Sequence, residues 1–372
     1  MNNKITRRRS DYWLSLAIFG LIVFGLIMIY SVSKYYSLDL SNGQTDKLFL
    51  KKQLITAALG ILAWVFFQTV DYRYWQKNAK YMLIATVGLL LLPMILAPLN
   101  LSHAGRWVGV GWAQFQPAEV AKLTFIFYIS GLFAAQGKNL KKIAQAFLPF
   151  AVIVGSISLL MLVQKDLGTL AIFIAIASSI FIVAGAPLYQ IFSGIGLAGF
   201  LFWLAIKLEP YRMARLTTFL NPDSGDAATY HIKNALIAIG SGGLFGLGFG
   251  QSKQKYLYLP EAHTDSIFAI ICEELGLLRA SLIILVFGFI AFRGIKIAKN
   301  APDVFSRLVA SGITVWLFLQ MTVNIAAMFS LVPLTGVPLP FVSYGGSSLI
   351  VILAAVGVLT NISKFGESYA RK

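Results

Sequence analysis

The chain has 372 residues, of which 58% are hydrophobic and 12% charged, and its formal net charge is +16. A soluble domain is nearer half apolar and a quarter charged, so this composition excludes an ordinary soluble protein. The lysines and arginines are dispersed among short loops between apolar runs, where they set membrane topology and meet anionic lipid, which argues against nucleic-acid binding.

Ten apolar runs are each long enough to cross a bilayer, which takes roughly 20 residues. They predict an all-α, polytopic membrane protein that forms one integral domain over residues 1–372, with transmembrane helices at 12–31, 50–70, 80–98, 117–135, 145–164, 168–185, 187–207, 266–291, 308–329 and 347–362. Basic residues precede the first run, but the run spans a full membrane thickness and lacks a small-x-small cleavage site. We therefore expect an uncleaved first helix.

The basic loops predict the orientation, with the N-terminus in the cytoplasm. Ten spans then place both termini in the cytoplasm and four segments on the outer side, at 100–116, 164–168, 207–264 and 330–346. The third segment is one long extracytoplasmic loop between the seventh and eighth helices, and loops of that length are usually functional. All the strong polar motifs fall on this outer side.

The first outer segment contains Gly105–Trp112, whose alternating glycines predict a short hairpin. Within it, Arg106 and Trp107 are candidates for an interfacial anchor or for contact with a lipid phosphate. In the helix that follows, Glu119 and Lys122 lie three residues apart and share one face, so they can pair. The pair is either a structural ion pair or part of a catalytic site.

The second outer segment is the turn 164–168, which carries Asp166. A turn aspartate commonly caps the next helix, and the alternative is that Asp166 faces a cavity and holds a cation or a substrate hydroxyl. The long loop supplies positive charge through Arg212, Arg215 and Lys233. Lys233 belongs to the amphipathic stretch Tyr230–Gly240, which is too short to span a bilayer and is expected at the interface.

A glycine-rich run, Gly240–Gly250, follows that stretch. Its glycines permit either close packing or a phosphate-cradling nest, and no Gly-Lys-Ser/Thr follows them, so the run is not a Walker motif. Further on, Glu273 and Glu274 lie about two turns inside the eighth span. Two adjacent acids cannot both pack on one helix face, so at least one is expected to pair with a basic group or to stay protonated.

Between these two features lies Tyr258–Asp265, the most ionisable part of the outer side. Thr264 or Asp265 is expected to cap the next helix, and Asp265 at the entrance of that helix is alternatively a general base. Glu261, His263 and Asp265 alternate along the chain, which is a weak signal for metal ligands. The last outer segment contains three prolines and three glycines, which prevent a plain helix and favour a re-entrant loop that ends near Ser343.

In this order, the motifs resemble those of the SEDS family (shape, elongation, division and sporulation), over nearly the whole chain. The residues that carry the resemblance are Arg106-Trp107, Phe115–Glu119 with Lys122, Asp166–Thr169, Ala238–Gly243, Leu259–Asp265, Glu273-Glu274 and Leu339–Ser348. Gly248–Lys255, taken with Leu259–His263, looks more like the FtsW division branch than the RodA elongation branch. The sequence departs from the family at Lys165, where proline is common, and at Ser266, where a larger residue is usual.

The resemblance implies a peptidoglycan glycosyltransferase that polymerises lipid II on the outer face of the bacterial cytoplasmic membrane, at the division septum. It also implies a class B penicillin-binding transpeptidase as partner, together with other division or elongation proteins. The family's essential aspartate maps onto Asp265, the expected base. The residues expected to bind substrate are Arg106, Trp107, Glu119, Lys122, Asp166, Arg212, Arg215, Lys233, Glu261, His263 and Ser343.

A divalent cation, Mg or Mn, held near Asp166, Glu261 or Asp265 is an alternative means of stabilising the pyrophosphate. Two other classes of function stay open. A lipid II flippase would place polar groups near the midplane and show internal repeats, and a scaffold would only recruit and activate the transpeptidase. Glycan product formed in detergent, without a second membrane compartment, discriminates the enzyme from both.

Overall fold

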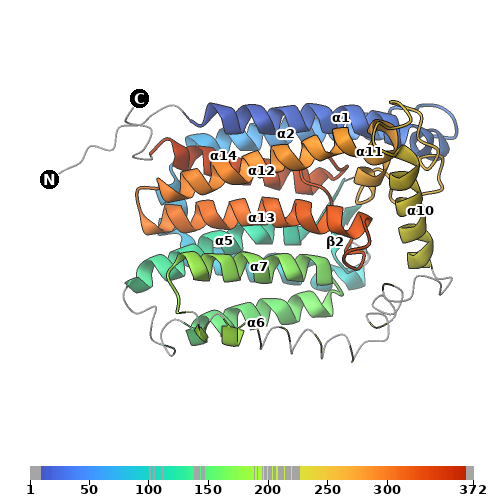
Figure 1. Ribbon diagram of the computed structural model, residues 1–372. Coiled ribbons are helices and arrows are strands. Elements are labelled where there is room, and N and C mark those ends of the chain that lie inside the picture. The colour runs from blue at the N-terminus through green and yellow to red at the C-terminus, as the bar shows by residue number, and fades with distance from the viewer. Residues whose placement is uncertain are drawn as a thin grey trace.

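The computed structural model describes residues 10–99, 102–103, 105–110, 113–137, 143, 147–187, 189–190, 192–194, 196, 199, 203, 207, 213, 219 and 227–365. The long helices of the described chain lie side by side in a bundle (Figure 1). The helices are α1 (Tyr12–Leu40), α2 (Leu48–Thr69), α3 (Tyr72–Lys77), α4 (Ala79–Leu96), the 3-10 helix η1 (Ala97–Leu99), α5 (Pro117–Gln136), α6 (Leu148–Val163), α7 (Leu167–Val183), α10 (Ala227–Gly242), α11 (Ile267–Leu275), α12 (Leu277–Lys299), α13 (Val304–Met328) and α14 (Gly346–Ser363).

Seven of the described helices are long and apolar enough to cross a membrane, namely α1, α2, α4 with η1, α5, α12, α13 and α14, and α6 and α7 are shorter apolar helices. The protein is therefore a multi-pass α-helical membrane protein. The expected seventh span, 187–207, and the first part of the long loop fall largely outside the described residues. The count of ten spans thus stays a prediction.

Of two further expected elements, one differs in the structure and the other is confirmed. The span expected at 266–291 is two helices, because Gly276 between α11 and α12 has φ +82°, a conformation that breaks a right-handed helix. The hairpin expected near Gly105 is confirmed as part of a small antiparallel sheet of β1 (Ser102–His103), β2 (Trp107–Val110) and β3 (Ala113–Phe115), in which Val108 pairs with Phe115.

Helix α14 is the centre of the bundle, and 89% of its span is buried by other helices. It packs closely on α2, where a Cβ on Gly60 would lie 2.6 Å from the Leu353 side chain and one on Gly357 would lie 2.6 Å from the Trp64 carbonyl. An apolar helix in a membrane protein can face either lipid or other helices, and α14 is the one whose window is buried most completely among the seven candidate spans.

The two ends of the bundle are chemically different. At one end the described chain termini meet, since the backbone N–H of Asp11 donates to Ser363 and the Asp11 carboxylate pairs with Arg293 at 2.6 Å. Tyr72 and Asp303 meet at the same end through a 2.6 Å hydrogen bond. The opposite end carries the β-sheet, α10, α11 and the segment between α13 and α14 (Figure 1). The polar motifs of the sequence therefore gather at one end of the bundle.

Candidate active site at the end opposite the termini

The break between α11 and α12 is joined to the glycine run by backbone hydrogen bonds. The N–H groups of Leu247 and Gly248 donate to the carbonyls of Glu273 and Glu274 at 2.9 and 3.0 Å. These carbonyls would otherwise be orphaned at the end of α11. A Cβ on Gly242 would collide with the Cys272 carbonyl. The packing interpretation of the run is therefore confirmed, and the two amides are engaged within the fold.

Both buried acids of α11 have partners. The carboxylate of Glu274 pairs with Lys255 at 2.9 Å, as the sequence predicts for at least one of the two acids. Glu273 accepts a short hydrogen bond from the Ser252 hydroxyl and accepts from the backbone N–H groups of residues 253 and 254 at 2.9 and 3.3 Å. The two acids thus hold the loop at 252–255 against α11.

His263 anchors the loop that leads to α11. Its ring lies against Phe49, Tyr36 and Tyr344, with centroid distances of 4.4, 5.0 and 5.5 Å. Its backbone carbonyl accepts from the N–H of Tyr344 at 2.8 Å. Burial lowers the pKa of His263, although the charge of Glu261 opposes this effect. His263 is thus a neutral ring in an aromatic box, and it does not line the cavity described below.

Glu261 is exposed, and its backbone has φ +50°. Its carboxylate accepts from the Thr264 hydroxyl at 2.7 Å, and its carbonyl accepts from the N–H groups of Thr264 and Ser266 at 3.1 Å each. The residue closes a tight turn just before α11. These contacts indicate that Glu261 stabilises the conformation of the loop before α11.

Asp265 lies at the entrance of α11, half-buried. The N-cap of α11 is Ser266, whose side chain makes no capping hydrogen bond, so the expectation that Thr264 or Asp265 forms the cap is wrong. The backbone carbonyl of Asp265 accepts from Asn324 at 2.7 Å. A Cβ on Gly336, which has φ +66°, would lie 3.7 Å from Oδ2 of Asp265. The carboxylate therefore lies beside the segment that joins α13 to α14.

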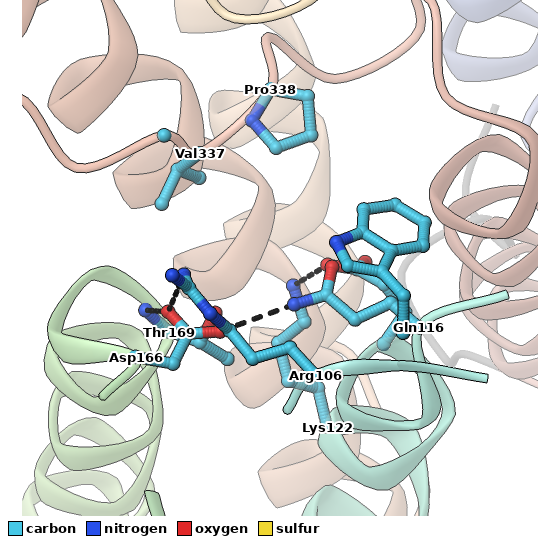
Figure 2. Close-up of a pocket in the computed structure, with 10 residues that line it drawn as sticks. Arg106, Gln116, Lys122, Asp166, Thr169, Val337 and Pro338 are labelled. Atoms are coloured by element: carbon cyan, nitrogen blue, oxygen red, sulfur yellow. Dashed lines mark hydrogen bonds and ion pairs between the residues drawn. The ribbon is translucent and has the colours of Figure 1, made fainter. Parts of the chain in front are cut away.

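That same segment forms one wall of a small, open polar cavity with a volume of about 40 Å³. The cavity is lined by Arg106, Trp107, Gln116, Glu119, Lys122, Asp166, Thr169, Gly336, Val337 and Pro338. Figure 2 shows that these residues come from the β-sheet, the starts of α5 and α7, and the segment before α14. Gly336 is the residue shared by the cavity and the surroundings of Asp265.

Asp166 is the polar centre of this cavity (Figure 2). Its carboxylate caps α7 by accepting from the N–H of Thr169 at 3.2 Å, which confirms the capping prediction. It also accepts from the side chain of Gln116 at 3.1 Å and lies 3.8 Å from the guanidinium of Arg106. The Nε of Arg106 is buried and has no partner among the described residues, so this guanidinium retains a hydrogen-bond donor.

The predicted pair of Glu119 and Lys122 forms deeper in the cavity. Nζ of Lys122 lies 2.8 Å from the Glu119 carboxylate, and both side chains are almost fully buried. Lys122 also donates to Gln320 at 3.1 Å, and Glu119 accepts from Ser348 at 3.2 Å. Each charge is thus both paired and hydrogen-bonded, as a buried ion requires.

The structure brings five predicted residues together in the cavity, namely Arg106, Trp107, Glu119, Lys122 and Asp166, and Asp265 lies beside its wall. Ser343 instead accepts from the N–H of Leu339 at 2.8 Å, inside the segment before α14, and Lys233 is exposed on α10. Arg212 and Arg215 lie outside the described residues. Sequence reasoning gave no role to Gln116, although it lies in the Phe115–Glu119 motif. It missed Gln320 and Asn324, since isolated amides in the apolar helix α13 carry no pattern of their own.

A family model described as cell cycle protein, for FtsW, RodA and SpoVE, matches residues 12–368. Stage V sporulation protein E of Bacillus subtilis (strain 168) is 40% identical over 351 residues, which cover 93% of this chain and 95% of that protein. A probable peptidoglycan glycosyltransferase FtsW of Thioalkalivibrio sulfidiphilus (strain HL-EbGR7) is 35% identical over 365 residues, 96% of this chain and 90% of that protein.

Among solved structures, a chain from a study of polymerization and crosslinking by a peptidoglycan synthase complex is similar, with a TM-score of 0.76. It is 23% identical, and the match covers 95% of this chain and 97% of that one, so it supports the fold. The family match and the sequence relatives both cover nearly the whole chain. The chain belongs to the FtsW, RodA and SpoVE family of cell cycle proteins.

Proposed function

We propose that this protein is a peptidoglycan glycosyltransferase that polymerises lipid II on the outer face of the bacterial cytoplasmic membrane, with Asp265 as general base. The observation that carries the proposal is the position of Asp265, a half-buried carboxylate separated by Gly336 from a polar cavity. The family relative named a probable peptidoglycan glycosyltransferase supports the reaction class. Both termini are proposed to be cytoplasmic, with the cavity end outside and the protein at the septum.

The reaction is one displacement at the anomeric carbon of the donor. The hydroxyl oxygen of the acceptor sugar forms the new bond, the bond to the pyrophosphate oxygen breaks, and the hydroxyl proton passes to the Asp265 carboxylate. A base placed opposite the leaving group gives inversion. General-base catalysis of this kind contributes roughly 10²–10⁴-fold to the rate.

The departing pyrophosphate needs positive charge. Inside the cavity, the described candidate for this role is Arg106. Its buried Nε has no partner among the described residues, and its guanidinium lies 3.8 Å from Asp166, which is long for an ion pair. Arg212, Arg215 and Lys233 are further candidates on the long loop. Lys122 is less suited, since Glu119 already neutralises it.

The described residues form no site made of protein ligands alone for a resident divalent cation. No group of three or more His, Cys, Asp or Glu side chains that could hold a metal ion occurs in the described part of the chain. Asp166 and Glu261 are instead engaged in a helix cap and a tight turn. The mechanism therefore routes no step through Mg or Mn.

The partner is proposed to be a class B penicillin-binding transpeptidase, with other division or elongation proteins. The solved structure with the similar fold belongs to a peptidoglycan synthase complex in which polymerization and crosslinking are coordinated, which supports a partner of this chemistry. The rival functions are a lipid II flippase and a non-catalytic scaffold. The two buried acids of α11, Glu273 and Glu274, are both hydrogen-bonded or ion-paired within the fold, as structural groups are, and so give no support to a transport path.

The deciding experiment supplies purified protein and its transpeptidase with fluorescent lipid II in detergent. Asp265→Asn keeps the size and hydrogen-bonding capacity of the side chain but removes the base. We expect it to fold and to lose glycan product, whereas the control Asp39→Asn, an exposed carboxylate at the end of α1, keeps full activity. Product at the normal rate from Asp265→Asn would rule out Asp265 as base, and no product from the unaltered protein would favour a flippase or scaffold.

A further inference from the structure

The segment between α13 and α14 has no regular secondary structure from residue 331 to 339. Its backbone carbonyls therefore need hydrogen-bond donors from elsewhere, because a buried peptide carbonyl without one is costly. Two side-chain amides on α13 supply them. Gln320 donates to the carbonyl of Pro338 at 3.0 Å, and Asn324, one turn later, donates to the carbonyl of Val337 at 2.9 Å.

Asn324 makes a second bond that connects this wall to the proposed base. The same amide nitrogen donates to the backbone carbonyl of Asp265 at 2.7 Å. An amide NH₂ has two protons, and both are thus used on carbonyl acceptors in two segments that lie far apart in sequence. Only the NH₂ end can make these contacts, so the orientation of the amide is fixed. Oδ1 of Asn324 is buried without a partner among the described residues. Among the described residues, the side chain is therefore held only by the two hydrogen bonds that its NH₂ group donates.

We infer that Asn324 is the positioning residue of Asp265: it clamps the backbone of Asp265 to the cavity wall and so sets the carboxylate against the space left by Gly336. The inference rests on the proposed role of Asp265 as base. Asn324 is almost fully buried, and it acts on the base through the peptide group of Asp265 and not by touching substrate. Gln320 extends the clamp to the Glu119 and Lys122 pair, since its Oε1 accepts from Lys122.

Displacement of a catalytic group by about 1 Å typically costs on the order of 10²-fold in rate. Loss of the clamp should therefore lower kcat of polymerisation by roughly 10–100-fold, with KM for lipid II within about twofold of its normal value. A residue that only supported folding would instead lower the amount of folded protein and leave kcat per folded molecule unchanged.

The test compares Asn324→Leu with Asn361→Leu in the purified full-length protein with its transpeptidase. Asn361 is an equally buried amide at the other end of the bundle, where it donates to the carbonyl of Gln68 at 2.8 Å and accepts from the N–H of Tyr72 at 3.1 Å. We expect both variants to lose thermal stability and only Asn324→Leu to lose kcat. Equal kcat for the two variants per folded molecule would overturn the inference.

Hydrogen–deuterium exchange gives a readout that does not depend on activity. In Asn324→Leu, we expect faster exchange in peptides that cover residues 261–266 and 335–343, and in Asn361→Leu we expect no change there. Unchanged exchange in Asn324→Leu would refute the clamp even if polymerisation fell. If Asp265→Asn proves active, the base assignment fails, while the exchange result still decides whether Asn324 joins the two segments.

Discussion

Replacing Lys122 by methionine isolates the energetics of the buried pair under the cavity. Methionine fills a similar volume without charge. The substitution leaves the carboxylate of Glu119 almost fully buried and without its ion pair. The 3.2 Å hydrogen bond from the Ser348 hydroxyl to this carboxylate remains. It also removes the ammonium group that lies 4.8 Å from the ring centroid of Trp316.

Breaking a buried ion pair by removing one partner costs about 3–5 kcal/mol, because the other charge stays in a poorly solvating environment. Lys122→Met should therefore lower the free energy of unfolding by about that amount. In Glu119→Gln/Lys122→Met no charge is left uncompensated, so its cost should be smaller than the sum of the single substitutions by about 2–3 kcal/mol.

The measurement is a double-mutant cycle of denaturant unfolding in detergent micelles. The exposed Lys253→Met is the control, which we expect within about 0.5 kcal/mol of the unaltered protein. Additive losses in the double variant would refute the reasoning, since they would mean that the two charges do not depend on each other.

Two further predictions concern the glycine run and the aromatic box. Gly242→Ala should destabilise the protein by about 1–3 kcal/mol, because the added Cβ collides with a backbone carbonyl that cannot move aside, whereas Gly240→Ala meets open space and should be tolerated in the same unfolding assay. The folded-state pKa of His263 lies below its ordinary 6.5, so the unfolded state binds more protons, and stability should fall as the pH drops below about 6.5. His263→Phe should make the unfolding midpoint less pH-dependent, with His231, whose pKa burial also lowers, supplying a remaining slope; an unchanged pH dependence would contradict this.

Sequence alone was enough for features that depend on neighbours along the chain. Long apolar runs require helices in a bilayer, because a helix satisfies all its backbone groups within one segment. Glu119 and Lys122 are three residues apart on a helix, and Asp166 directly precedes the helix it caps, so both contacts follow from local geometry. The alternating glycines before Trp112 likewise predicted the hairpin that forms the sheet.

The break at Gly276 was not predicted because the apolar run resumes after it, so that Glu273, Glu274 and the glycine were all placed inside one span. The break between α11 and α12 is stabilised by backbone N–H groups of the glycine run, which donate to the carbonyls of Glu273 and Glu274 from another part of the chain. The partner of Glu274 was equally unspecified: the sequence required a basic group, and the fold selected Lys255.

The apolar runs of the sequence were sufficient to predict a helical membrane protein. Which polar side chains contact one another follows instead from how the helices pack. Asp265 lies beside the cavity because Asn324, 59 positions away in sequence, holds its carbonyl and that of Val337. A contact of this kind depends on how α13 packs against two irregular segments, and no spacing along the chain encodes that packing.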